Sequence, residues 1–178
     1  MKSFNTTGPC DPEMHYMLPP EARLVGAGLN RYLDEKLYWV LHAPRQTGKT
    51  TFLISWMREL NATGKYVACY VSVEVTQGIT DIERAMPLIC ASIRKYAKDF
   101  RVPVPQTDIE KPGFMLSNIL ENWANLVAPK PLIVLFDEVD VLTGEAMISF
   151  LRQLRGGFAS RGVGNFPISV ALVGMRDL

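Results

Sequence analysis

Short apolar runs alternate with longer amphipathic segments along the chain. Four of these runs are rich in β-branched and aromatic residues and lie at residues 37–43, 66–73, 132–136 and 168–173. Each is too short for a typical helix and is apolar at consecutive positions, which predicts a strand that is buried on both faces. Strands of this kind are typical of a parallel sheet with helices on both sides.

The segments between the runs repeat apolar residues at helical spacing. They predict helices over residues 48–61, 81–100, 114–127 and 145–160. In the second segment Asp81 is placed to cap the helix, and Pro87 either kinks it or marks its true start. Buried strands that alternate with helices predict an α/β fold, a three-layer αβα sandwich around a mostly parallel sheet.

Composition places the chain among ordinary globular proteins. Residues 1–23 are rich in Pro, Gly and polar side chains, so we expect an extended arm before a single core domain over residues 24–178. The formal net charge is +1. Because a nucleic-acid partner usually goes with a basic surplus, this balance gives no support for one.

Cysteine usage and hydropathy indicate a cytoplasmic protein. The chain has three cysteines, Cys10, Cys69 and Cys90, and no CxxC pair. An odd number of scattered cysteines argues against a disulfide framework or a zinc site, so reduced thiols are expected. The apolar runs are far too short to span a bilayer, and the N-terminus lacks the apolar segment of a secretory signal, so no membrane contact is expected.

A candidate phosphate-binding loop occupies residues 43–51 (APRQTGKTT), between the first strand and the first long helix. Apart from Ala43, which replaces the first glycine, these residues match the pattern GxxxxGK(S/T). Gly48 permits the tight turn, Lys49 is expected to reach the β- and γ-phosphates, and Thr50 is expected to supply a hydroxyl to Mg²⁺. The nucleotide contacts are assigned to Pro44, Arg45, Gln46, Thr47, Gly48, Lys49, Thr50 and Thr51.

A second motif, LIVLFDE at residues 132–138, ends the third strand in two acids. Acids at the carboxyl end of a buried parallel strand face the crevice where such sheets bind ligands. Asp137 is therefore expected to hold Mg²⁺, directly or through water, and Glu138 to act as general base on the attacking water. Alternatively, the acids end the strand and cap the next element; for Asp140 we favour that structural or capping role. The loop at residues 43–51 could also be a plain helix start with a glycine turn and a solvated Lys49. The presence of the acidic motif makes that interpretation weaker than phosphate binding.

Basic residues near the predicted site have two interpretations. Arg176 lies at the tip of the fourth strand. In P-loop ATPases with an extra strand between the two motif strands, a polar residue at this tip senses the γ-phosphate, and a guanidinium suits that role. Alternatively, Arg176 pairs with Asp177 or is solvated. Arg152, Arg155 and Arg161 follow the acidic motif, and one of them could reach a neighbouring subunit as an arginine finger. We favour a solvated helix face for these three.

The motifs together resemble those of the bacterial and archaeal AAA-like ATPases, a group near the origin-recognition and STAND signalling ATPases. The likeness rests on residues 8–10 (GPC), 15–20 (HYMLPP), 42–51 (HAPRQTGKTT), 136–140 (FDEVD), 151–155 (LRQLR) and 174–177 (GMRD). It covers nearly the whole chain, and an alanine at the first glycine position of the loop is typical of the group.

The resemblance implies a P-loop NTPase fold with the strand order 5-1-4-3-2 and places the arm around residues 16–20 near the adenine. The family continues beyond the fourth strand with a fifth strand and a helical lid, whereas this sequence stops at Leu178. We therefore expect a C-terminally truncated core in which the first strand lies at the sheet edge, where a long apolar strand tends to associate.

Four functions are compatible with these residues. The first is an ATPase that binds ATP and Mg²⁺ and activates water through Glu138. The second is a nucleotide-dependent switch or scaffold that hydrolyses ATP slowly or not at all. A protein partner or a homo-oligomer is compatible with both of these functions. The third, a small-metabolite kinase, is disfavoured because such kinases rarely place Asp-Glu at the end of the acidic strand. The fourth, DNA binding, is disfavoured by the charge balance alone.

Overall fold

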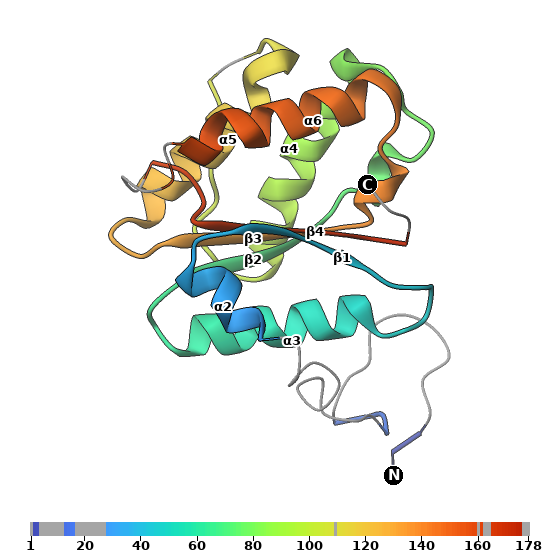
Figure 1. The fold of residues 1–178 in the computed structure, drawn as a ribbon, viewed down its shortest axis with the longest axis vertical. Coiled ribbons are helices and arrows are strands. Elements are labelled where there is room, and N and C mark those ends of the chain that lie inside the picture. The colour runs from blue at the N-terminus through green and yellow to red at the C-terminus, as the bar shows by residue number, and fades with distance from the viewer. Residues whose placement is uncertain are drawn as a thin grey trace.

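A four-stranded parallel sheet forms the centre of the protein (Figure 1). The computed structural model describes residues 2–3, 13–16, 28–108, 110–159, 161 and 165–175. The strands are β1 (Tyr38–His42), β2 (Val67–Ser72), β3 (Leu132–Asp137) and β4 (Ser169–Gly174), in the spatial order β1-β4-β3-β2. All four predicted strands are confirmed, and their order is the one that the family resemblance implies for strands one to four.

Helices cover both faces of the sheet (Figure 1). One face carries α2 (Leu29–Asp34) and α3 (Lys49–Ala62), and the other carries α4 (Ile82–Asp99), α5 (Pro112–Val127) and α6 (Gly144–Phe158). Two short 3-10 helices, η1 (Glu74–Thr76) and η2 (Val139–Val141), follow β2 and β3. The predicted three-layer αβα sandwich is therefore confirmed, together with its four long helices.

The start of α4 follows from its local sequence. Asp81 Oδ1 accepts a hydrogen bond from the Glu83 backbone N–H at 2.8 Å, which is the predicted N-cap. Pro87 lies at an exposed position inside the helix, and α4 continues past it to Asp99. Pro87 therefore does not mark the helix start.

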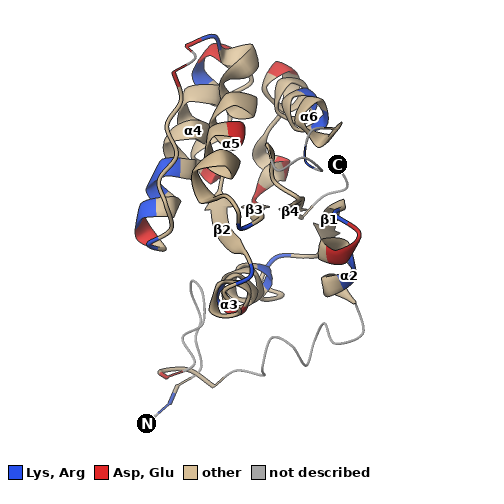
Figure 2. Ribbon diagram, turned by 90° about the vertical axis from the view of Figure 1, so that its left-hand side faces the viewer, with Lys and Arg blue, Asp and Glu red and all other residues tan. Residues whose placement is uncertain are grey.

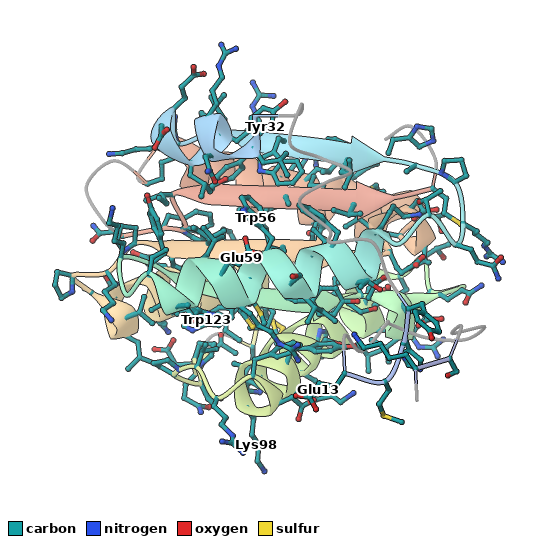
Figure 3. The ribbon with its side chains drawn as sticks, turned by 90° about the horizontal axis from the view of Figure 1, so that it is seen from below. Glu13, Tyr32, Trp56, Glu59, Lys98 and Trp123 are labelled. Atoms are coloured by element: carbon teal, nitrogen blue, oxygen red, sulfur yellow. The ribbon has the colours of Figure 1, made fainter. Side chains whose placement is uncertain are left out.

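The short helix α2 was not predicted from the sequence. It is held by Leu33, which is 4% exposed, and by Tyr32, whose ring stacks on Trp39 of β1 with 5.3 Å between centroids. Trp39 in turn meets Trp56 of α3 edge-on at 5.9 Å. In Figure 3, Tyr32 and Trp56 lie on the face of the sheet that α2 and α3 cover. A helix of six residues is too short to leave a periodic signal, so tertiary contacts define it.

Apolar packing on both faces of the sheet fixes the layers. Leu53 and Met57 of α3 are at most 2% exposed, and Trp123 and Phe150 are fully buried on the opposite face. Burial of one such side chain contributes about 1.5–3 kcal/mol. Since α3 begins at the candidate phosphate loop, its packing on the sheet also positions that loop.

One of the two edge strands of the sheet is β1. Within the described ranges β1 pairs with β4 alone, and Val40 in the middle of β1 is 53% exposed. This agrees with the expected edge position of the first strand. No helix in the described part of the chain is both long and apolar enough to cross a membrane.

The N-terminal arm is described only at residues 2–3 and 13–16. Ser3 and His15 form an isolated parallel bridge there. Residues 17–23 lie outside the described residues, so the boundary of the arm at residue 23 and its place near the adenine stay predictions.

Candidate functional site

The two sequence motifs meet at the carboxyl edge of the sheet. The loop after β1 leads directly into α3 at this edge (Figure 1), and the acidic pair ends β3. The strand register places His42 beside Gly174 and Ser72 beside Asp137. In parallel sheets this edge is where ligands bind, so the topology brings the candidate residues to the expected place.

The candidate phosphate loop has the backbone that a tight turn into a helix requires. Gly48 is the N-cap of α3 with φ 84°, in the left-handed region that glycine enters without a steric penalty. Gln46 also has a positive φ, 58°. The Thr47 hydroxyl donates to the Pro44 carbonyl at 2.9 Å and closes the loop. The first N–H groups of a helix generally lack an intrahelical acceptor, and such helix starts favour anions.

Lys49 lies over this loop. Its ammonium donates to the carbonyl oxygens of Ala43 at 2.7 Å and Pro44 at 2.8 Å. The side chain is half-buried, in contrast to the solvated lysine of the alternative interpretation. Its charge is therefore held at the mouth of the loop, where phosphate oxygens could replace the carbonyl partners.

Thr50 and Asp137 join the two motifs. The Thr50 hydroxyl donates to Asp137 Oδ2 at 2.7 Å, although the residues are 87 positions apart in the sequence. Asp137 is only 1% exposed, and its Oδ1 accepts the backbone N–H of Glu138 at 3.0 Å. Magnesium prefers hard oxygen ligands and uses few protein groups beside substrate phosphates and water. The hydroxyl of Thr50 and the carboxylate of Asp137 fit that preference.

Glu138 combines an unusual backbone with an unusual charge environment. Its φ is 60°, a left-handed conformation that costs a residue with a side chain about 1–3 kcal/mol. Burial raises the pKa of its carboxyl, and the charges of Asp137, Asp140 and Glu74 raise it further, while Lys49 opposes them. Backbone strain and a shifted carboxyl pKa are typical of functional sites.

Asp140 lies against the end of β4. A Cβ built on Gly174 would be 2.6 Å from Asp140 Oδ1, so the two elements are in close contact. Oδ1 itself is buried without a hydrogen-bond partner in the described part of the chain. Asp140 does not cap α6, whose N-cap is Thr143. The structural role favoured from the sequence is therefore supported, and the capping role is not.

The tip of β4 is tied to the end of β1. His42 Nε2 donates to the Met175 carbonyl oxygen at 2.5 Å, and Arg45 Nε donates to Met175 Sδ at 2.9 Å. The side chain of Arg45 thus points to β4 at this edge of the sheet. Arg176, the candidate γ-phosphate sensor, lies outside the described residues and stays a prediction.

The three arginines after the acidic motif differ from one another. Arg152 and Arg155 are exposed on α6, as expected for a solvated face. Arg161 is half-buried and donates to the carbonyl oxygens of Lys36 and Phe158. Its guanidinium also lies 3.4 Å from the centroid of the Phe158 ring. The expectation of a solvated Arg161 was wrong, because these contacts hold the side chain against its own chain.

One contributor to the site was not expected from the sequence. The Tyr70 hydroxyl donates to Asp137 Oδ2 at 3.1 Å, beside the bond from Thr50. Tyr70 lies in the middle of an apolar run, YVACYVSV, where a tyrosine looks like any core aromatic residue. Only the register of β2 on β3 shows that its hydroxyl reaches the acidic motif.

Comparisons with known proteins bear on the fold. No family model and no curated protein sequence matches the chain. The Walker-type ATPase PABY2304 of Pyrococcus abyssi superposes with a TM-score of 0.58 at 15% identity, over 96% of this chain and 48% of its own. Cdc6p from Pyrobaculum aerophilum gives a TM-score of 0.55 at 18% identity, over 90% and 40%.

A third solved structure, Drosophila ORC bound to poly(dA/dT) DNA and Cdc6, gives a TM-score of 0.55 at 11% identity, over 89% of this chain and 25% of that one. The chain thus spans half or less of the length of each of these three structures. At these identities the similarity shows the fold. The chain therefore shares the α/β fold of these structures, one of which is a Walker-type ATPase.

Proposed function

We propose that the chain binds ATP with Mg²⁺ and hydrolyses the nucleotide. The observation that carries the proposal is the hydrogen bond between Thr50 and Asp137, which unites the phosphate loop with the acidic motif. The buried, bonded carboxylate of Asp137 and the half-buried ammonium of Lys49 add charges of both signs at the same edge of the sheet. Phosphoryl transfer depends mainly on such placement of charges around the phosphates.

Nucleotide binding is assigned to the loop and the first turn of α3. Lys49 would exchange its carbonyl partners for phosphate oxygens, and backbone N–H groups of the loop would contact the remaining ones. Thr50 and Asp137 would hold Mg²⁺, which neutralises phosphate charge when bound. The proposed nucleotide contacts are those of Pro44, Arg45, Gln46, Thr47, Gly48, Lys49, Thr50 and Thr51.

Glu138 is the proposed general base. Its carboxyl has a raised pKa and lies next to Asp137, where an attacking water would have to approach the phosphates. A raised pKa makes the carboxylate a stronger base than an ordinary glutamate. Arg176, at the tip of β4, is proposed as the sensor of the γ-phosphate.

The second candidate is a nucleotide-dependent switch that hydrolyses ATP slowly or not at all. It is favoured by the contacts of His42 and Arg45 with Met175, which link the phosphate loop to the tip of β4. A change in the conformation of the loop on nucleotide binding would then move the tip of β4. A protein partner or a second copy of the chain would bind one of the two conformations in preference to the other.

The test that separates the two candidates is steady-state phosphate release from Mg·ATP by wild type, Glu138→Gln and Glu110→Gln. Glu110 is an exposed loop residue and serves as the matched control. An ATPase requires that only Glu138→Gln falls to background. Equal background rates for all three proteins would contradict hydrolysis and leave the switch.

We infer that nucleotide is the partner of this chain and that its charge gives no clear sign of a nucleic-acid partner. One of the matched structures is an ORC assembly bound to DNA. In this chain, however, the net charge is only +1, and Figure 2 shows Lys, Arg, Asp and Glu interspersed over the helices. A gel shift with random duplex DNA at low salt tests this, since electrostatic binding is strongest there. A shifted band would contradict the inference.

We also place the protein in the cytoplasm. Cys69 and Cys90 are both free thiols and both buried, which suits a reducing compartment. Cell fractionation of the tagged protein checks this assignment, and recovery in a secreted fraction would contradict it.

A further inference from the structure

Tyr70 reaches the acidic motif from the neighbouring strand. The register pairs Ser72 of β2 with Asp137 of β3, and Tyr70 lies two residues before Ser72 on the same face of the sheet. From there its hydroxyl donates to Asp137 Oδ2 at 3.1 Å. The tyrosine is 6% exposed, so its hydroxyl is directed at the carboxylate and away from solvent.

The ring of Tyr70 is held by two aromatic neighbours. Tyr96 meets it edge-on with 5.3 Å between centroids, and Phe100 meets it edge-on at 6.1 Å. Tyr96 belongs to the last turn of α4, and Phe100 is the C-cap residue of that helix. Aromatic neighbours on the ring keep the Tyr70 hydroxyl in a fixed place beside the carboxylate of Asp137.

The two hydroxyl donors of Asp137 Oδ2 have different positions in the fold. Thr50 belongs to the first turn of α3 and thus to the phosphate loop, where nucleotide binding acts directly. Tyr70 belongs to β2 and is fixed by α4. Asp137 Oδ2 thus has a second hydroxyl donor that does not belong to the phosphate loop.

We propose that Tyr70 is a positioning residue for Mg²⁺, which acts by holding the carboxylate of Asp137 in the orientation that the ion requires. This inference rests on the proposed function. It assigns Tyr70 no contact with the nucleotide. Loss of its hydroxyl should therefore raise the Mg²⁺ concentration that ATP binding requires, without changing the binding of ATP in the absence of metal.

The test compares Tyr70→Phe with wild type and with Tyr96→Phe. Phe keeps the ring at position 70, and Tyr96→Phe removes a hydroxyl from the same aromatic cluster without touching Asp137. ATP binding is measured by calorimetry in EDTA and over a series of Mg²⁺ concentrations, and a thermal melt checks folding. Loss of an outer partner of a metal ligand typically weakens metal affinity by about 10-fold or more. We expect Tyr70→Phe to need about 10-fold more Mg²⁺ for half-maximal binding.

The same experiment contains the results that would overturn the inference. Wild-type Mg²⁺ dependence in Tyr70→Phe would overturn the role of Tyr70 while leaving the proposed function intact. An equal rise in the Mg²⁺ requirement of Tyr96→Phe would also overturn the role of Tyr70, because the effect would then come from the aromatic cluster. Absence of ATP binding by the wild type would overturn the proposed function and, with it, this inference.

A double-mutant cycle supplies a second readout. If Tyr70 acts through Asp137, the effect of Tyr70→Phe on the Mg²⁺ requirement disappears in an Asp137→Asn background. An effect of the same size in both backgrounds would mean that Tyr70 acts by another route, which contradicts the inference.

Discussion

The carboxylate of Asp140 lies directly against Gly174 at the tip of β4. A Cβ on Gly174 would be 2.6 Å from Asp140 Oδ1 and 3.1 Å from Asp140 Cβ. We therefore expect Gly174→Ala to destabilise the protein by about 1–3 kcal/mol, the usual cost of excess volume at a packed site. Urea unfolding measures the loss.

The double variant Gly174→Ala with Asp140→Ala controls this prediction. Removal of the carboxylate gives the new methyl group space, so the two changes together should cost less than the sum of the single changes. Additive losses, or a Gly174→Ala protein as stable as the wild type, would contradict the contact.

Two adjacent glycines of α6 should respond in opposite directions. A Cβ on Gly157 would run into the ring of Phe166, whereas a Cβ on Gly156 would meet nothing within 4 Å. Gly157→Ala should therefore destabilise the protein by about 1–3 kcal/mol, and Gly156→Ala should stabilise it by about 0.5–1 kcal/mol. Thermal unfolding of the two variants compares them directly, and equal melting temperatures would contradict the packing of Phe166 against α6.

The charge environment of Glu138 gives a prediction about stability and pH. A carboxyl whose pKa is raised by folding binds its proton more readily in the folded state, so its contribution to stability falls as pH rises between the unfolded and folded pKa. Glu138→Gln removes that charge. Its Tm should exceed the wild-type Tm at about pH 7, and the gain should shrink towards about pH 4.

Glu110→Gln, an exposed change of the same kind, controls for the loss of one negative charge and should leave Tm nearly unchanged. A Glu138→Gln protein that melts at or below the wild-type temperature at about pH 7 would contradict the raised pKa.

Most of the fold could be predicted because its elements carry strong local patterns. The four strands are continuous apolar runs, and Asp81 marks the start of α4 through a side-chain hydrogen bond. The helix α2 left no such pattern, since it depends on the stacking of Tyr32 on Trp39. The sequence therefore predicts elements that bury a whole stripe or face, and misses those that depend on a few distant contacts.

The candidate site divides in the same way. The sequence identifies Lys49, Thr50 and Asp137 because their chemistry requires fixed spacing and strand ends. It does not show that Tyr70 joins them, because a one-residue shift of register would turn its side chain to the opposite face. It also does not show the left-handed backbone of Glu138, which depends on how η2 leaves β3.

The central claim is that the phosphate loop binds ATP, and calorimetric titration of ATP with Mg²⁺ into wild type, Lys49→Ala and Lys65→Ala tests it most directly. Lys65 is exposed and lies beyond the opposite end of α3 from the loop, so it serves as the control. Hydrogen bonds to charged groups contribute about 1.5–3 kcal/mol, so Lys49→Ala should weaken binding by about 10-fold to 100-fold. Lys65→Ala should bind like the wild type. Undiminished ATP binding by Lys49→Ala, or no binding by the wild type, would contradict the claim.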